Sequence, residues 1–289
     1  MKIPLHFVVL LSLVPLPVSA QRVEPRVAVA ARHRNVNINF KAMKKPLFHG
    51  VGAADIRQGE LNNCTLVGSM AAVAHSRPDV IKRMIVPSER LGWLNVAFGG
   101  KAARRNLPKN DLASGTVSIN NEVAFAYGEP LYAFDASAQS SWVSMVEKAY
   151  AKLYGGAKGY EALDHGGLAE TALSRLTGGN VSVIRLFPEA AKSRENQQSL
   201  WKEITHALDN RLPTTLLSPA RGEQLPGGLG IFPWHTYALV GAKTHSGAAW
   251  VELYNPHCSS ILDRGKFFKM PLEEFAASFE EMFVANPVP

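Results

Sequence analysis

Cysteine is scarce in this chain, whose 289 residues include only Cys64 and Cys258. A disulfide-stapled scaffold carries several pairs of cysteines at regular spacings, so this class of protein is excluded. Two cysteines allow either one bridge between Cys64 and Cys258 or two thiols with separate roles. The role of cysteine is therefore the question that decides the function.

Long hydrophobic runs are also lacking. The apolar stretch within residues 1–20 follows Lys2, is interrupted by Pro15 and Pro17, and ends in Val-Ser-Ala. A membrane-spanning helix needs about 20 predominantly apolar residues, so this stretch is too short. Its layout is that of a secretory signal peptide. We expect cleavage after Ala20 and a secreted or periplasmic protein without a membrane span.

Charge of one sign is not in large excess, since 31 Lys and Arg residues face 24 Asp and Glu residues. A net charge of +7 is typical of a soluble protein and only weakly favours an acidic partner. Basic residues gather within residues 21–45, but no aromatic residue accompanies them before Phe40. We therefore expect no nucleic-acid partner and interpret residues 21–45 as a solvated basic linker or pro-segment.

The hydrophobic periodicity predicts an α+β fold. Helical spacing and terminal glycines predict helices near 64–74, 78–85, 140–156, 168–179 and 198–210. Alternating or β-branched runs predict strands near 93–98, 116–127, 181–187, 213–218, 235–243, 248–254 and 266–271. Helices dominate the first half, so we expect a helical lobe over 46–179 and an antiparallel β-rich lobe over 180–289.

One thiol lies where chemistry would activate it. Cys64 follows the polar loop DIRQGELNN and opens the predicted helix, with Asn62 and Asn63 as candidate N-caps. A helix N-terminus and a neighbouring imidazolium can both lower the pKa of a thiol. Cys64 is therefore a candidate nucleophile.

A predicted hairpin supplies candidate partners for this thiol. A three-residue turn centred on His245 would place His235 directly opposite Asn255. The imidazole would act as the base, and the asparagine carbonyl would orient it. Gln58 on the polar loop and the backbone N–H of Cys64 would supply oxyanion donors. Each residue also has an ordinary structural interpretation: a buried cysteine, a core histidine and a strand-end asparagine.

The same residues resemble the calpain family of papain-like cysteine proteases. The matching stretches run in order from about 46 to 285 and read DIRQGELNNC, WVSMVEKAYAKLYGGAKGYEAL, LTGG, PWHTYALVGA, WVELYNP and GKFFKMPLEEF. The resemblance implies a two-lobed, papain-like endopeptidase with a cleft between the lobes. It assigns Cys64 as nucleophile, His235 as general base and acid, and Asn255 as orienter. It places Gln58 in the oxyanion hole and makes a protein or peptide the substrate.

Departures from the family pattern concern the surroundings of the site. Thr65 stands where calpains usually have tryptophan, and the family's Asn-Pro-Trp-Gly is Asn255-Pro256-His257-Cys258 here. The missing tryptophan would have shielded the bond between histidine and asparagine. Trp142 and Trp234 could pack near the site or lie in the core. The resemblance allows calcium, but no acidic cluster has the spacing of a calcium loop.

Other functions remain open on the same residues. One alternative is another acyl transfer or amide hydrolysis, such as transamidation or cleavage of cell-wall amides. A second is a catalytically weak relative that binds peptides. The sequence does not indicate the oligomeric state.

Overall fold

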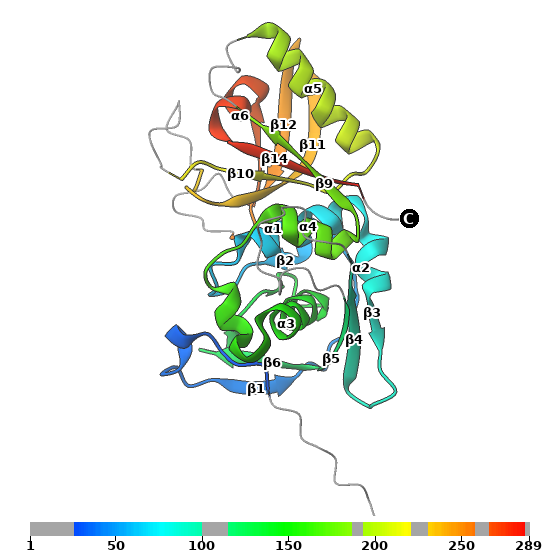
Figure 1. Cartoon of the computed structure of the whole chain (residues 1–289), viewed down its shortest axis with the longest axis vertical. Helices are drawn as coiled ribbons and strands as arrows, with labels where there is room; N and C mark the ends of the chain where they lie inside the picture. The colour runs from blue at the N-terminus through cyan, green and yellow to red at the C-terminus, as the bar shows by residue number, and fades with distance from the viewer. Residues whose placement is uncertain (1–25, 100–114, 187–192, 221–230, 258–265, 287–289) are drawn as a thin grey trace, which may run out of the picture.

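The computed structural model describes residues 26–99, 115–186, 193–220, 231–257 and 266–286. It shows an elongated molecule in which a six-stranded sheet with α5 and α6 lies at one end (Figure 1). Helices α1, α2 and α4 occupy the middle, and α3 lies beyond them with three small sheets. Helices and antiparallel sheets are mixed along the chain, which makes this an α+β fold.

Six α-helices lie within the described residues. They are α1 (Cys64–Ser76), α2 (Pro78–Met84), α3 (Trp142–Gly155), α4 (Ala169–Thr177), α5 (Arg194–Asp209) and α6 (Leu272–Ser278). Three short 3-10 helices, η1 (Ala31–His33), η2 (Ala53–Asp55) and η4 (Gly156–Leu163), lie between other elements. Each helix predicted from the sequence is therefore present. Gly178 ends α4 with a left-handed φ of 75°, a conformation that glycine adopts at little cost.

The main sheet is antiparallel and is built almost entirely after residue 180. Its order is β13 (Phe267–Pro271), β12 (Ala248–Tyr254), β11 (Thr236–His245), β10 (Thr214–Leu217), β14 (Glu281–Asn286) and β9 (Asn180–Arg185). Strand β14 was not predicted from the sequence, yet it lies inside the sheet between β10 and β9.

Three smaller sheets accompany the helices before residue 136. They contain β1 (Asn39–Ala42), β6 (Glu122–Ala126) and β7 (Glu129–Pro130); β2 (Ile56–Arg57) and β8 (Phe134–Asp135); and β3 (Ile85–Pro87), β4 (Trp93–Phe98) and β5 (Gly115–Asn120). The region expected to be a helical lobe thus also contains seven short strands, β2 to β8, within the described residues.

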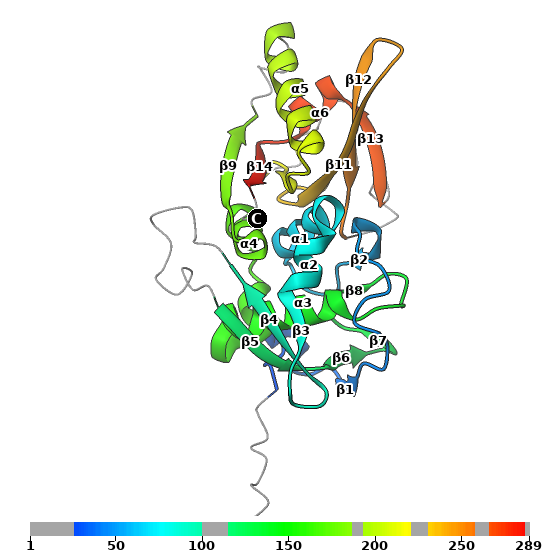
Figure 2. The ribbon, with the colours of Figure 1, turned by 90° about the vertical axis from the view of Figure 1, so that its right-hand side faces the viewer.

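Both faces of the main sheet are buried. Successive side chains along a strand point to opposite faces, so each strand contributes to the core on either side. On β11, Tyr237 and Leu239 join a core with α5 and α6, whereas Ala238 between them joins a core with α1, α3 and α4. On β14, Met282 and Phe283 divide in the same way. Figure 2 shows α5 and α6 on one side of the curved sheet and α1 on the other. The sheet therefore couples two hydrophobic cores.

Helix α1 is almost completely buried between the sheet and α4. Ten of its thirteen residues are buried, including Val67, Met70 and Ala71 with no exposed surface. Small side chains allow this close packing. A Cβ built on Gly68 would lie 2.9 Å from the carbonyl oxygen of Thr236 and 3.0 Å from its Cγ2. Glycine at position 68 therefore allows β11 to approach the first turns of α1.

The hairpin between β11 and β12 has a different register from the one predicted. Its turn contains Ser246 and Gly247, which have φ angles of 50° and 78°, and His245 pairs with Ala248. Two positive φ angles are the mark of a two-residue type I′ turn, which matches the twist of the flanking strands. A bulge between Leu239 and Gly241 then shifts the pairing once more. The prediction that His235 lies directly opposite Asn255 is wrong.

The segment interpreted as a solvated linker is packed where it is described, from residue 26 onward. Strand β1 pairs with β6, and Ala30 is fully buried. The backbone N–H of Ala30 donates a hydrogen bond of 3.1 Å to the hydroxyl of Tyr132. Residues 26–45 differ from a solvated linker because their apolar side chains, including Val27 and Phe40, pack on the core. The predicted signal peptide and Cys258 lie outside the described residues.

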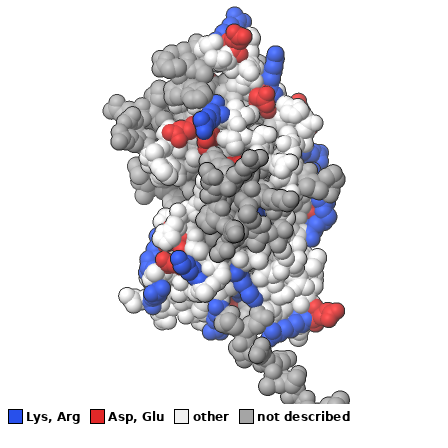
Figure 3. All heavy atoms as spheres, viewed as in Figure 1, with Lys and Arg blue, Asp and Glu red and all other residues white. Residues whose placement is uncertain are grey.

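Acidic and basic side chains are interspersed on the face of the molecule in Figure 3. One cluster joins Asp79 to Arg83 at 2.7 Å and to Arg77 at 3.3 Å. No helix among the described residues has the length and hydropathy needed to cross a membrane.

Replacement of Gly68 tests the packing of α1. Alanine usually stabilises a helix by about 1 kcal/mol relative to glycine, but overpacking against backbone costs about 1–3 kcal/mol. We expect the overpacking to outweigh the gain, so that Gly68→Ala lowers the free energy of unfolding by up to about 2 kcal/mol, measured by urea denaturation. The control is Gly50→Ala, where the new Cβ would meet Asp55 at an ordinary 3.6 Å. A Gly68→Ala variant as stable as the parent would contradict the close approach.

Candidate active site

Cys64 is the first residue of α1, at the end of the helix that faces the start of β11. Its thiol is free and partly exposed. The sulfur lies 3.8 Å from the backbone oxygen of Trp234, a residue 170 positions later in the chain. The segment that carries His235 therefore passes directly over the helix N-terminus.

His235 and Asn255 meet in a buried hydrogen bond. Nε2 of His235 lies 2.8 Å from Oδ1 of Asn255. The backbone N–H of His257 donates to the same Oδ1 at 2.9 Å. A backbone N–H can only donate, so this side-chain atom of Asn255 is an oxygen rather than the amide nitrogen. His235 must then donate through Nε2–H, which leaves Nδ1 of the neutral ring unprotonated and able to accept a proton.

The observed register explains how these side chains meet without being directly opposite. Ala238 pairs with Tyr254, so the next residues outward, Tyr237 and Asn255, face each other at the end of the ladder. His235 lies two residues before Tyr237 and shares its face. Diagonal neighbours on an antiparallel pair are about 7–8 Å apart between Cα atoms, within reach of an imidazole and a carboxamide.

Gln58 lies beside the Asn255 end of this arrangement. Its backbone N–H donates to the carbonyl oxygen of Pro256 at 2.9 Å. Its side chain is buried, and Nε2 donates to the carbonyl oxygen of Leu61 at 2.6 Å. A carboxamide nitrogen carries two hydrogens, so one N–H remains after this bond. The structure thus holds the loop before Cys64 against the residues that follow Asn255.

Asn63 occupies the N-cap position of α1, but its side chain makes no capping hydrogen bond. Nδ2 of Asn63 instead donates to Oε1 of Glu147 at 2.7 Å. Glu147 is fully buried on α3, and its other oxygen accepts from the backbone N–H of Ala133 at 2.9 Å. Burial raises the pKa of Glu147 to about 7, against the lowering effect of these two bonds. Asn63 therefore links the residue before the thiol to α3.

Aromatic rings surround His235, which sequence reasoning did not foresee. Tyr237 meets the imidazole edge to face at 4.8 Å between ring centroids, and Phe232 does so at 5.7 Å. The ring of His257, at the position of the family's tryptophan, lies 6.2 Å away. Burial lowers the pKa of His235 to about 4, while the bond to Asn255 raises it and His257 lowers it. His235 is consequently neutral near pH 7.

The thiol also favours its neutral form. Burial raises the pKa of Cys64, whereas the nearby polar groups of Thr236 and the backbone of Thr65 and of Cys64 itself lower it. The hydrogen bonds of the described residues include none between the sulfur and the imidazole. Catalytic hydrogen bonds are often long or poorly aligned before substrate binds. The resting site therefore holds a thiol and a neutral imidazole rather than an ion pair.

Trp142 and Trp234 differ in their environments. Trp142 is fully buried in the core, as its ordinary structural interpretation predicts. Trp234 has 69% of its surface exposed and a φ of 52°. Positive φ is a genuine outlier for a bulky residue and is often found at functional sites. A core position for Trp234 is wrong, because the chain turns outward there before entering β11.

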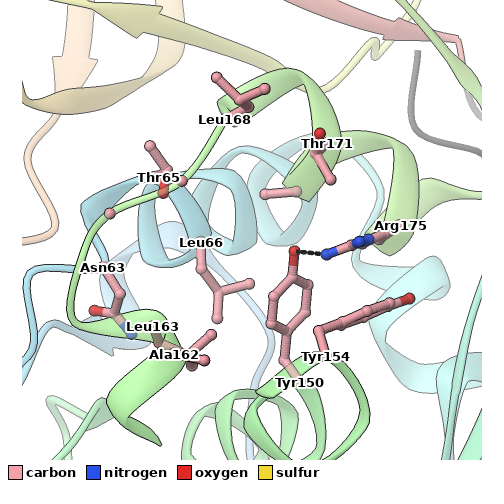
Figure 4. Close-up of a pocket in the computed structure, with 13 residues that line it drawn as sticks. Asn63, Thr65, Leu66, Tyr150, Tyr154, Ala162, Leu163, Leu168, Thr171 and Arg175 are labelled. Atoms are coloured by element: carbon pink, nitrogen blue, oxygen red, sulfur yellow. Dashed lines mark hydrogen bonds between the residues drawn. The ribbon is translucent and has the colours of Figure 1, made fainter. Parts of the chain in front are cut away.

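A pocket of about 290 Å³ is lined by Asn63 and Thr65, the sequence neighbours of Cys64, but not by Cys64 itself. Figure 4 shows Asn63, Thr65 and Leu66 along one wall and Tyr150, Tyr154 and Arg175 at the opposite end. Arg175 donates from Nη1 to the hydroxyl of Tyr150 at 2.9 Å, and its guanidinium lies 3.5 Å from the ring centroid of Tyr154. The threonine at position 65, where calpains usually have tryptophan, borders this space.

Metal-ligating side chains do not gather in the part of the chain that the structure describes. No three His, Cys, Asp or Glu side chains there lie close enough together to hold a metal ion.

Comparison with known proteins identifies the family. The family model described as calpain family cysteine protease matches residues 30–273, which include Gln58, Cys64, His235 and Asn255. The chain belongs to the calpain family. Membership supports a cysteine peptidase.

The calpain relatives are much longer than this chain. Calpain-type cysteine protease ADL1 of Oryza sativa subsp. japonica is 31% identical over 218 residues, covering 74% of this chain and 9% of the relative. Calpain-type cysteine protease DEK1 of Arabidopsis thaliana is 33% identical over 134 residues, covering 46% of this chain and 6% of the relative. Calpain-7 of Homo sapiens is 22% identical over 252 residues, covering 83% of this chain and 29% of the relative. The chain thus spans less than a third of these relatives.

The burial of neutral His235 predicts a loss of stability in acid. A histidine whose pKa is about 4 when folded and about 6.5 when unfolded binds fewer protons in the native state. Its contribution is present above about pH 6.5 and is lost as pH falls toward 4. We expect acidification from about pH 7 to about pH 4.5 to cost roughly 2 kcal/mol more in the parent than in His235→Gln.

Urea unfolding at the two pH values measures this difference. Glutamine can still donate a hydrogen bond to Asn255, so the variant mainly removes the titrating group. His206→Gln is the control, since His206 is exposed on α5. Equal acid losses in the parent and His235→Gln would show that His235 does not carry the effect.

Proposed function

We propose that this protein is an exported cysteine endopeptidase with a papain-like, two-lobed fold. The proposal rests mainly on the two hydrogen bonds that Oδ1 of Asn255 accepts, one from the backbone N–H of His257 and one from Nε2–H of His235. Because Nε2 carries the proton, Nδ1 of His235 is left as the proton acceptor at the N-terminal end of α1. The two hydrophobic cores on either side of the main sheet support two lobes. Export rests on the features of residues 1–20, and the mature chain would begin at Gln21.

The proposed reaction begins with transfer of the Cys64 proton to Nδ1 of His235. The thiolate attacks the carbonyl carbon of a peptide bond, forming a carbon–sulfur bond and an oxyanion. The oxyanion collapses to a thioester as the carbon–nitrogen bond breaks, and the imidazolium gives its proton to the leaving amine. Water then attacks the thioester with His235 as base, which breaks the carbon–sulfur bond, releases the acid and restores the thiol. Asn255 accepts from Nε2–H throughout, which keeps the ring in the orientation that exposes Nδ1.

Two donors would stabilise the oxyanion. The backbone N–H of Cys64 lies at the start of α1, where amide groups have no partner within the helix. The second is the remaining N–H of Gln58 Nε2, on a side chain held by its bond to Leu61. Donors that are fixed before the reaction avoid a reorganisation cost, which is the main source of such stabilisation.

A protein or peptide is the proposed substrate, and the pocket beside Cys64 offers space for one of its side chains. Another acyl transfer on the same thiol would use the same proton transfer. It would differ only in the nucleophile that takes the acyl group from the thioester, an amine instead of water. The raised pKa of Cys64 favours a second candidate, a catalytically weak relative that binds peptides. Digestion of a peptide library by the purified protein, with and without calcium, separates the two functions.

Replacement of the nucleophile is the first test of mechanism. Because the triad acts as a unit, Cys64→Ala should lower peptide hydrolysis by about 10³-fold or more, measured as kcat/KM on a peptide from the library. Cys258→Ala, the same change at the other cysteine, should keep activity. Retention of most activity in Cys64→Ala would refute the assignment of the nucleophile.

Replacement of Gln58 tests the oxyanion hole. Loss of one donor should lower kcat by about 10²-fold with little change in KM, since the interaction forms with the developing charge. Gln58→Glu, which keeps the size but places acceptor oxygens there, should be at least as impaired as Gln58→Ala. A rise in KM with unchanged kcat would instead identify Gln58 as a ground-state contact.

A further inference from the structure

Thr236 is the residue through which β11 touches the start of α1. It follows His235 directly, is fully buried, and packs against Gly68, one helical turn after Cys64. Residues four apart on a helix share a face, so the surface that receives Thr236 is also the surface that carries the thiol. Two residues earlier, the backbone oxygen of Trp234 contacts the sulfur of Cys64, so this segment lies against the start of α1 at both positions.

The hydroxyl of Thr236 has no hydrogen-bond partner among the described residues in the resting site. Its Oγ1 is buried and unpaired. The backbone and the hydroxyl of Thr236 lie near enough to the sulfur of Cys64 to lower the pKa of the thiol. A neutral thiol is a weak acceptor, whereas a thiolate accepts a charge-assisted hydrogen bond. Ionisation of Cys64 therefore supplies the acceptor that this buried donor lacks.

We propose that the Thr236 hydroxyl donates a hydrogen bond to the Cys64 thiolate and is a further catalytic residue of this site. The proposal rests on the proposed function in one respect, that Cys64 is the nucleophile. When the thiol proton moves to Nδ1 of His235, the negative charge stays on sulfur, and the hydroxyl hydrogen of Thr236 turns toward it. No other bond forms or breaks in this step.

The site needs such a donor because burial opposes both charges of the ion pair. Burial raises the pKa of Cys64 and lowers that of His235. His257, whose ring lies 6.2 Å from the ring of His235, lowers the pKa of His235 further. Among the described residues, the groups that lower the pKa of Cys64 belong to Thr236, Thr65 and Cys64 itself, and none of them is charged. Hydrogen bonds to sulfur therefore carry much of the stabilisation of the thiolate.

The neighbouring strand provides a matched control. Thr215 on β10 is also fully buried, and its Oγ1 likewise has no partner among the described residues. It pairs with Ala238 rather than facing Cys64. Thr→Val replaces a hydroxyl by a methyl group of similar size, so the same change at the two positions separates the effect on the thiolate from the effect on packing.

The test measures the ionisation of Cys64 rather than peptide cleavage. The rate of alkylation by iodoacetamide is followed against pH by mass spectrometry of the Cys64 peptide in the full protein. We expect Thr236→Val to raise the apparent pKa of Cys64 by about one unit, giving about tenfold slower alkylation on the rising part of the profile. Thr236→Ser should keep the parent's pKa, and Thr215→Val should not change it.

Thr236→Ala is the second variant if valine disturbs the packing over Gly68, because it removes the hydroxyl without adding volume. It too should raise the pKa of Cys64, with folding checked by thermal unfolding. A folded Thr236→Val or Thr236→Ala protein with the parent's pKa would overturn the proposal. If the parent protein cleaves no peptide although Thr236→Val raises the pKa of Cys64 as expected, the proposed function fails and this proposal stands. The two failures are therefore distinguishable.

Discussion

The close crossing of β11 over α1, between Thr236 and Gly68, is the contact on which the rest of this structure depends. It joins the two hydrophobic cores, because the face of the main sheet that covers α1 is continuous with the strands that pack on α5 and α6. It also sets the position of the thiol relative to the histidine. Packing and chemistry are therefore determined by the same few residues.

Electrostatics at the site is a balance between burial and hydrogen bonding. Burial disfavours the charged forms of both Cys64 and His235. Against it act the helix N-terminus, the backbone donors near the sulfur, and the oxygen of Asn255 that accepts from Nε2. In the proposed reaction, a site with this balance would be neutral at rest and would acquire charge only when the proton moves from sulfur to the imidazole. The aromatic rings of Tyr237 and Phe232 contribute by excluding water from the imidazole.

The sequence predicts five of the six described α-helices, most strands of the main sheet and the meeting of His235 with Asn255, because these depend on local periodicity and on a hairpin. It does not predict the register, although the Ser246-Gly247 pair is a recognised turn signal that could have corrected it. Strand β14 was missed because it follows α6 closely and resembles a continuation of that segment. The outward position of Trp234 depends on a backbone φ that no pattern of side chains encodes.

The contact between Cys64 and Trp234 spans 170 positions of the chain, which has a consequence for biosynthesis. Long-range contacts form late in folding because they require the closure of large loops. During synthesis the thiol leaves the ribosome well before the strand that carries its partners, and β14 follows the other described strands of the sheet. A nascent or partly folded chain therefore contains the cysteine in an ordinary environment. The order of residues along the chain delays assembly of the reactive centre until the surrounding domain has formed.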